Sequence, residues 1–238
     1  MQSKSRLKKR TWMACLLLAV GVPLLLAAGI HAFWNRSYYF ISICIIVLAM
    51  IPFFLVFEGR KPKAREILVI AVLVALAAIG RAAFFMVPQF KPMAAIVIIA
   101  GIMLGAETGF LTGALSAFVS NFFFGQGPWT PWQMFAFGIM GLFAGLLFYK
   151  KHGEELESRV AVCIYGGVST VLFYGVIMDT ASLLMYSGEV TVAGLLAMYA
   201  SGLPFNLIHA ASTVVFLWVL YCPMAKKLRR VRLKYGLL

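Results

Sequence analysis

Long apolar runs, separated by short charged or Pro/Gly-rich breaks, recur along the chain from Trp12 to Cys222. A helix needs roughly 20 residues to cross the ~30 Å hydrocarbon layer of a membrane, and most of the runs have about that length. Backbone amides cannot stay unpaired in hydrocarbon, and no alternating strand pattern occurs, so the runs are predicted to be helical. The pattern predicts eight helices, over residues 12–30, 38–57, 66–87, 92–105, 108–125, 131–149, 160–186 and 195–222.

Two of these runs admit a second interpretation. The run 92–105 is short for a full crossing and is followed by Glu107, so residues 92–125 could instead form a re-entrant hairpin. The run 12–30 follows a basic segment and ends near Ala27-Ala28-Gly29, which resembles the cleavage site of a secretory signal. Its length favours an uncleaved membrane anchor.

Composition excludes a water-soluble globule, because 63% of the 238 residues are hydrophobic and only 12% are charged. The fold class is therefore all-α, a polytopic membrane bundle. The net charge of +13 does not indicate a nucleic-acid partner, since the basic residues occupy short blocks between apolar runs. The cysteines stand singly within apolar runs, which makes disulfide or zinc frameworks unlikely.

Basic residues predict the orientation, because cytoplasmic loops retain Lys and Arg. Eighteen of the 21 lie before the first run, in the segments 58–66 and 150–159, or after the last run. Both termini are therefore predicted to be cytoplasmic in a multi-pass protein of the cell membrane, surrounded by lipid. The charged segment near residue 60 divides the chain into a two-helix extension (1–64), a six-helix membrane domain (65–222) and a basic cytoplasmic tail (223–238).

Polar side chains inside membrane helices are costly, so they are the first candidates for function. On the predicted topology, five of them fall towards the outer side, and they predict a binding pocket that opens outward: Arg81, Asn121, Asp179, Asn206 and His209. Each also has a structural interpretation. Arg81 could extend to the interface, Asp179 could cap a helix, and the pair on the last helix could hydrogen-bond between helices.

Two outer segments add candidates for binding. They combine rigid prolines with aromatic and amide side chains, which are the residue types that hold planar heterocycles. The candidates from these segments are Lys91, Trp129, Trp132 and Gln133. The alternative for the tryptophans is an interfacial aromatic belt.

Small residues recur every four positions, a spacing that lets membrane helices approach closely. The series Gly101, Gly105, Gly109 and Gly113 is expected to serve internal packing. Ala71 and Ala75 form a similar pair near the start of the third run, and such a pair on the surface could dock another subunit.

No catalytic constellation occurs in the sequence. There is no HExxH, no phosphate-binding GxxxxGK[ST] loop, no acidic metal-binding repeat and no Asp-rich prenyl-diphosphate motif. We therefore expect no catalytic residue, no metal site and no cofactor. A membrane-embedded enzyme with an acid/base pair formed between helices, or an autonomous channel or transporter, remains the alternative.

The region 65–222 resembles the substrate-binding S component of energy-coupling factor (ECF) transporters. The likeness lies in the Ala71/Ala75 pair, the Pro-rich segment after it, the stretch from Gly105 to Asn121 and the segment from Gly127 to Met134. The resemblance implies a six-helix core that captures a vitamin outside the cell. It also implies a transmembrane coupling subunit, contacted by the alanine pair, and two cytoplasmic ATPases. The two N-terminal helices depart from the six-helix pattern.

The resemblance leaves the vitamin open. The leading candidate for the substrate is cobalamin or a related corrinoid, and another heterocyclic vitamin such as riboflavin is the alternative.

Overall fold

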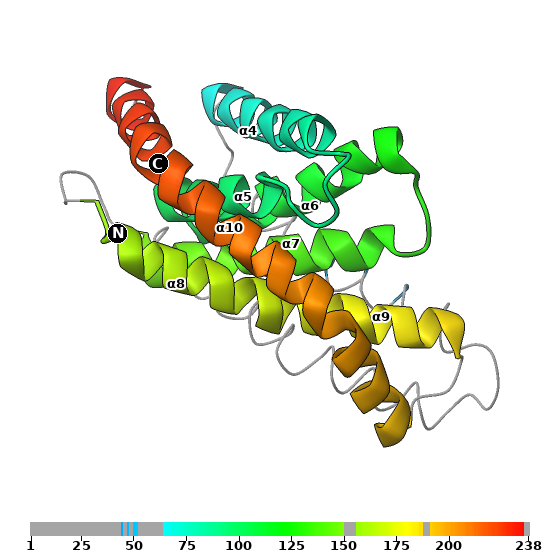
Figure 1. The fold of residues 1–238 in the computed structure, drawn as a ribbon. Coiled ribbons are helices and arrows are strands. Elements are labelled where there is room, and N and C mark those ends of the chain that lie inside the picture. The colour runs from blue at the N-terminus through cyan, green and yellow to red at the C-terminus, as the bar shows by residue number, and fades with distance from the viewer. Residues whose placement is uncertain are drawn as a thin grey trace, which may run out of the picture.

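The computed structural model describes residues 64–149, 156–187 and 191–235, together with Cys44, Val47, Met50 and Ile51 (Figure 1). The predicted helices 12–30 and 38–57 lie almost entirely outside the described residues, as does the predicted extension that they form. The elements are α4 (Ala64–Ala83), α5 (Met93–Leu104), α6 (Ala106–Phe124), α7 (Thr130–Phe148), α8 (Arg159–Ser169), the π-helix η2 (Thr170–Gly175), α9 (Val176–Tyr186) and α10 (Val192–Tyr235). The described residues contain no strand, and the all-α class is confirmed.

Four of the described helical stretches are long and apolar enough to cross a membrane: α4, α7, the continuous stretch Arg159–Tyr186, and α10. Helix α5 has only 12 residues and every one of them is buried, so at about 18 Å it is shorter than the hydrocarbon layer. The residue before it is Pro92, which packs against Gly80 in α4. It ends beside the C-terminal part of α10, where Arg232 reaches the carbonyl of Met103. Helix α5 is therefore a short central helix enclosed by the rest of the bundle.

Three helices, α5, α6 and α7, contact one another backbone to backbone. Gly105 joins α5 to α6 with φ of +95°, a conformation that residues other than glycine rarely adopt. A Cβ atom on Gly101 or Gly109 would overlap the backbone carbonyl of Gly141, and one on Gly113 would overlap that of Phe137. The glycine spacing is therefore used for internal packing, which allows close approach of the three helices.

The last two helical stretches differ from their predicted form. The run predicted as one helix over 160–186 contains a six-residue π-helical segment, η2. The helix predicted to end at residue 222 continues to Tyr235, so that predicted end is wrong. Both Pro204 and Pro223 lie inside α10. The chain stays helical past Pro223 because the residues that follow are good helix formers and Arg232 is held against the bundle.

Basic residues gather at one end of the bundle, which we call the basic end. There the guanidinium of Arg65 lies 5.1 Å from the ring centroid of Tyr235, and that of Arg159 lies 5.0 Å from the ring centroid of Trp218. In Figure 1 the start of α4, the start of α8 and the end of α10 lie together at the left. The opposite end carries Arg81 in the last turn of α4, and we call it the Arg81 end.

Part of the N-terminal stretch packs against the described bundle. Met50 is 5% exposed and belongs to an apolar cluster with Phe110, Ala114 and Trp132. This contact places residue 50 on the side of α6 and α7.

Candidate functional site

A connected set of polar side chains lies at the Arg81 end. Nη1 of Arg81 donates to Oγ of Ser120 at 2.7 Å and to Oδ1 of Asn121 at 2.6 Å. Its guanidinium also lies over the ring of Phe124, 4.7 Å from the centroid. These contacts fasten the last turn of α4 to the last two turns of α6. They also give the guanidinium hydrogen-bond acceptors and an aromatic face, which a buried cation in an apolar bundle needs.

Asn121 carries the connection on to α7. It is fully buried, and its Nδ2 donates to Oγ1 of Thr130 at 3.0 Å and to Oε1 of Gln133 at 2.9 Å. Thr130 in turn donates to Oε1 of Gln126 at 2.9 Å. Because every amide atom of Asn121 is engaged, its side chain is fixed, and with it the positions of Arg81 and Gln133.

Lys91 stands beside this network through its backbone. Its N–H donates to Oγ of Ser212 at 2.8 Å, and the same hydroxyl donates back to the Lys91 carbonyl at 3.2 Å. The pair of bonds ties the segment between α4 and α5 to the middle of α10. Burial, together with the neighbouring Arg81 charge, lowers the pKa of the Lys91 ammonium. Two cationic side chains therefore share this end of the molecule.

A second polar pair joins α9 to α10. Nδ2 of Asn206 donates to Oδ2 of Asp179 at 2.8 Å. Glycines make room for both side chains, since a Cβ on Gly175 would stand 2.8 Å from Cγ of Asn206 and one on Gly202 would stand 2.6 Å from Oδ1 of Asp179. The pair is therefore fitted into the helix crossing and does not extend to a helix end.

An aromatic contact lies between these two polar groups. The ring of Tyr174, in η2, packs edge-on against His209 at a centroid distance of 4.6 Å. It also contacts the ring of Phe137 in a tilted arrangement, at a centroid distance of 4.7 Å. The Tyr174 hydroxyl interacts with Gln133 and lies within electrostatic range of Arg81 and Asp179. His209 is 4% exposed, and its Nδ1 has no hydrogen-bond partner among the described residues. Tyr174 thus links the Arg81 network with the Asp179–Asn206 pair.

The two predicted tryptophans occupy different surroundings. Trp132 is 4% exposed and lies in the apolar cluster with Phe110, Ala114 and Met50. Trp129 is 36% exposed and its ring covers Gly127. Trp129 therefore stands at the rim of the Arg81 end, whereas Trp132 contributes to the packing of α7.

The structure brings most of the predicted site residues to one region. Arg81, Asn121 and Gln133 are directly hydrogen-bonded in series, and Asp179 is bonded to Asn206. Sequence reasoning did not single out the residues that connect them: Ser120, Gln126, Thr130, Phe137, Tyr174 and Ser212. The π-helical segment that carries Tyr174 has no sequence signal that periodicity could detect. The described residues contain no group of three or more His, Cys, Asp or Glu side chains that could hold a metal ion.

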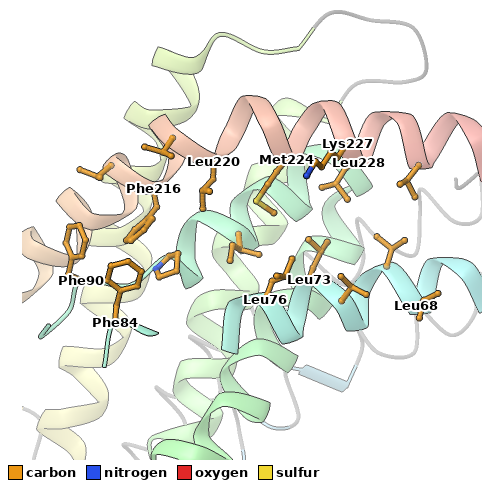
Figure 2. A pocket seen from close by; sticks show the side chains of 17 residues that line it. Leu68, Leu73, Leu76, Phe84, Phe90, Phe216, Leu220, Met224, Lys227 and Leu228 are labelled. Carbon is orange, nitrogen blue, oxygen red and sulfur yellow. The ribbon is translucent and has the colours of Figure 1, made fainter. Parts of the chain in front are cut away.

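An apolar groove runs between α4 and α10 on the side of the bundle (Figure 2). Its volume is about 720 Å³. Figure 2 shows Leu73 and Leu76 of α4 facing Leu220 and Met224 of α10 across it. Ala71 and Ala75 are exposed on α4, next to the groove residues Val72 and Leu76 in the sequence. The small-residue pair therefore lies on an open face beside an unfilled apolar groove.

The described residues thus form an all-α bundle with a hydrogen-bonded polar network at one end and an apolar groove on its side. A sequence model of the family described as "ECF-type riboflavin transporter, S component" matches residues 61–226. The chain belongs to this family, which is a family of transporter components and not of enzymes.

Curated relatives align over a shorter stretch. A UPF0397 protein of Vibrio atlanticus is 35% identical over 89 residues, which is 35% of this chain and 48% of that protein. The folate transporter FolT of Streptococcus mutans is 30% identical over 99 residues, covering 40% of this chain and 53% of that protein. The chain thus spans about half the length of the curated relatives that it matches. No solved structure matches the chain.

Proposed function

We propose that this chain is the substrate-capturing subunit of an ATP-driven vitamin importer. The observation that carries the proposal is the hydrogen-bonded series Arg81–Asn121–Gln133, which joins α4, α6 and α7 at the end opposite the basic residues. Such costly polar groups inside a membrane bundle mark a site of ligand recognition. The cation-rich end faces the cytoplasm under the positive-inside rule, so the Arg81 end faces outward.

The substrate site comprises the side chains at the Arg81 end. Arg81, Lys91 and Gln133 supply hydrogen-bond donors, and Trp129 at the rim supplies a face for stacking. Asp179, Asn206 and His209 complete the site from α9 and α10, with Tyr174 between the two groups. Two cations against one carboxylate favour a ligand that presents carbonyl or carboxylate oxygens.

This chemistry fits a planar, carbonyl-bearing heterocyclic vitamin. Riboflavin appears in the description of the family, and folate in the name of one relative. Both names favour a flavin-like or folate-like ligand over cobalamin, the lead from the sequence. Neither the family description nor the name of either relative mentions a corrinoid, and cobalamin stays a prediction to be tested beside riboflavin and folate.

Titration of the purified full-length protein tests the proposal. Riboflavin, folate and cobalamin are added separately, without ATP, and binding is measured by calorimetry or by quenching of tryptophan fluorescence. We expect one of them to bind. Arg81→Gln should weaken that binding by at least about tenfold, since a hydrogen bond from a charged donor contributes roughly 1.5–3 kcal/mol. Arg65→Gln, at the basic end, is the matched control and should keep the wild-type affinity.

Two results would overturn this assignment. One is the absence of binding by all three vitamins to protein that remains monodisperse in detergent and in nanodiscs. The other is an unchanged affinity in Arg81→Gln, which would remove the network from the substrate site.

The exposed pair Ala71/Ala75 and the groove beside it support a second part of the proposal. A transmembrane coupling subunit docks on this face of α4 and connects the chain to two cytoplasmic ATPases. Small side chains permit close helix approach, and the apolar groove offers surface that a partner helix can bury.

Bulky substitutions test the docking face. Ala71→Trp or Ala75→Trp should abolish transport in cells that contain the complete importer, while vitamin binding to the purified variants stays unchanged. Val168→Trp is the control, because Val168 in α8 is 53% exposed and lies away from the groove. Full transport by the two alanine variants would contradict the docking role.

A further inference from the structure

Helix α10 is too long to end inside the membrane. Its 44 residues extend over about 66 Å, whereas the hydrocarbon layer is about 30 Å thick. Its apolar sequence ends near Met224, and six of the ten residues from Lys226 to Tyr235 are basic: Lys226, Lys227, Arg229, Arg230, Arg232 and Lys234. The last three turns of α10 are therefore at the level of the lipid headgroups or beyond it.

These last turns have two distinct faces. Ala225, Leu228 and Arg232 are buried against the bundle, and Nη1 of Arg232 donates to the carbonyl of Met103 at 3.0 Å. The opposite face surrounds a hollow of about 550 Å³ lined by Lys226, Arg229, Arg230, Leu233 and Lys234. Positions three, four, seven and eight apart share one side of a helix, so this lining is continuous along the helix. We call it the cationic face.

The lining of this hollow is almost entirely cationic. Among the described residues it consists of four cations and one leucine, and it includes no carboxylate. Arg232, by contrast, is used to hold the helix end in place. Four like charges on two turns repel one another unless anions neutralise them.

From this arrangement we infer that the cationic face binds the phosphate groups of anionic phospholipids in the cytoplasmic leaflet. Lys and Arg next to a membrane helix attract such lipids, and the guanidinium groups of Arg229 and Arg230 can each hold a phosphate through two hydrogen bonds. Leu233, in the centre of the face, can insert among the upper acyl carbons. The inference goes beyond the proposed function and depends only on the embedding of α10 in a bilayer.

The experiment uses the full-length protein in vesicles of phosphatidylcholine that contain a trace of spin-labelled lipid. Electron paramagnetic resonance gives the association constant of spin-labelled phosphatidylglycerol relative to that of spin-labelled phosphatidylcholine. We expect the wild type to prefer phosphatidylglycerol. Arg229→Gln/Arg230→Gln should reduce this preference by about fivefold or more, since one cation near the surface contributes roughly that factor. High salt should reduce it as well.

The matched control is Arg65→Gln/Lys227→Gln, which removes two positive charges at the same end but outside the cationic face. It should retain most of the preference, because Arg229 and Arg230, the two side chains that can each hold a phosphate through two hydrogen bonds, are kept. An unchanged melting temperature in detergent reports that the bundle of each variant is intact, so failure of the lipid inference is distinguishable from failure of the proposed function.

Three results would overturn the inference. The Arg229/Arg230 variant could keep the full lipid preference, or the control could lose as much as the variant. Alternatively, millimolar inorganic phosphate could displace the spin-labelled lipid, which would make the hollow a site for soluble anions. If lipid preference persists in the variant while ATPases no longer co-purify with it, the face binds an acidic protein surface instead.

Discussion

The two halves of the bundle are built differently. In α5, α6 and α7 the helices meet backbone to backbone at Gly101, Gly109, Gly113 and Gly141. In α8, η2, α9 and α10 the contacts are made by side chains. These helices contain a π segment and two prolines, and no residue from Val192 to Ile208 is buried. The candidate site takes Asn121 and Gln133 from the first half and Asp179 and Asn206 from the second.

This difference separates two tasks within one site. In the backbone-packed half there is no room for a side chain at these glycines, because an added Cβ atom would overlap a peptide group. The other half has interrupted hydrogen bonding in its helices and little burial, which are the features of regions that open at low free-energy cost. We therefore expect the first half to hold the ligand's recognition geometry constant and the second half to admit and release the ligand.

The largest difference in stability is expected when a glycine is replaced by alanine in each of the two halves. Gly109→Ala introduces a methyl group that overlaps backbone atoms of Gly141 and Gly101, so it should destabilise the protein by about 3 kcal/mol or more. Gly167→Ala meets only the end of the Val214 side chain, at 3.2 Å, and should change stability by less than about 1 kcal/mol. Thermal unfolding in detergent measures both. Equal melting temperatures for the two variants would contradict the comparison.

A smaller contrast is expected between the two asparagines of the site. Asn121→Ala removes three hydrogen bonds, one each to Arg81, Thr130 and Gln133, which should cost about 3 kcal/mol of stability and most of the vitamin affinity. Asn206→Ala removes one hydrogen bond and should cost about 1 kcal/mol. Melting temperature and ligand titration are measured for both, and a larger loss in the Asn206 variant would reverse the assignment of roles.

The smallest effect concerns the rates of opening. Pro204 supplies no N–H, so the carbonyl of Ala200 has no helical partner in α10. Pro204→Ala restores that bond and should slow hydrogen exchange over residues 192–208 several-fold, with vitamin affinity nearly unchanged. Exchange followed by mass spectrometry checks this prediction. Leu203→Ala, one residue away, is the control, and an unchanged exchange rate in Pro204→Ala would remove the proline from any role in opening.

Hydropathy and length alone predicted the order and approximate bounds of six described helical stretches. These are α4, α5, α6, α7, the continuous stretch from α8 to α9, and α10. They could not decide whether residues 92–105 cross the membrane or belong to a re-entrant hairpin. A short apolar helix has the same sequence pattern whether it faces lipid or protein. The end of α10 was predicted 13 residues too early since Pro223 and the following charges resemble a helix stop. The helix continues because Arg232 contacts Met103, a residue far away in the sequence.

The site was predicted in part because buried polar residues are conspicuous in an apolar sequence. Arg81 and Asn121 stood out in this way, and the structure joins them by a direct hydrogen bond. Tyr174 did not stand out, since a tyrosine among Leu, Phe and Gly is ordinary in a membrane helix. Its position depends on η2, and a π segment shifts side chains around the helix in a way that a 3.6-residue period cannot anticipate.

The guanidinium of Arg232 occupies the place where the last carbonyls of α5 would otherwise be left without donors in the protein interior. The final turns of the chain thus complete the structure of its innermost helix. A shortened chain for crystallisation, or a fused reporter, should therefore be cut or attached beyond Tyr235. Removal of the residues after Val231 would take away Arg232 and leave the Met103 carbonyl without this donor.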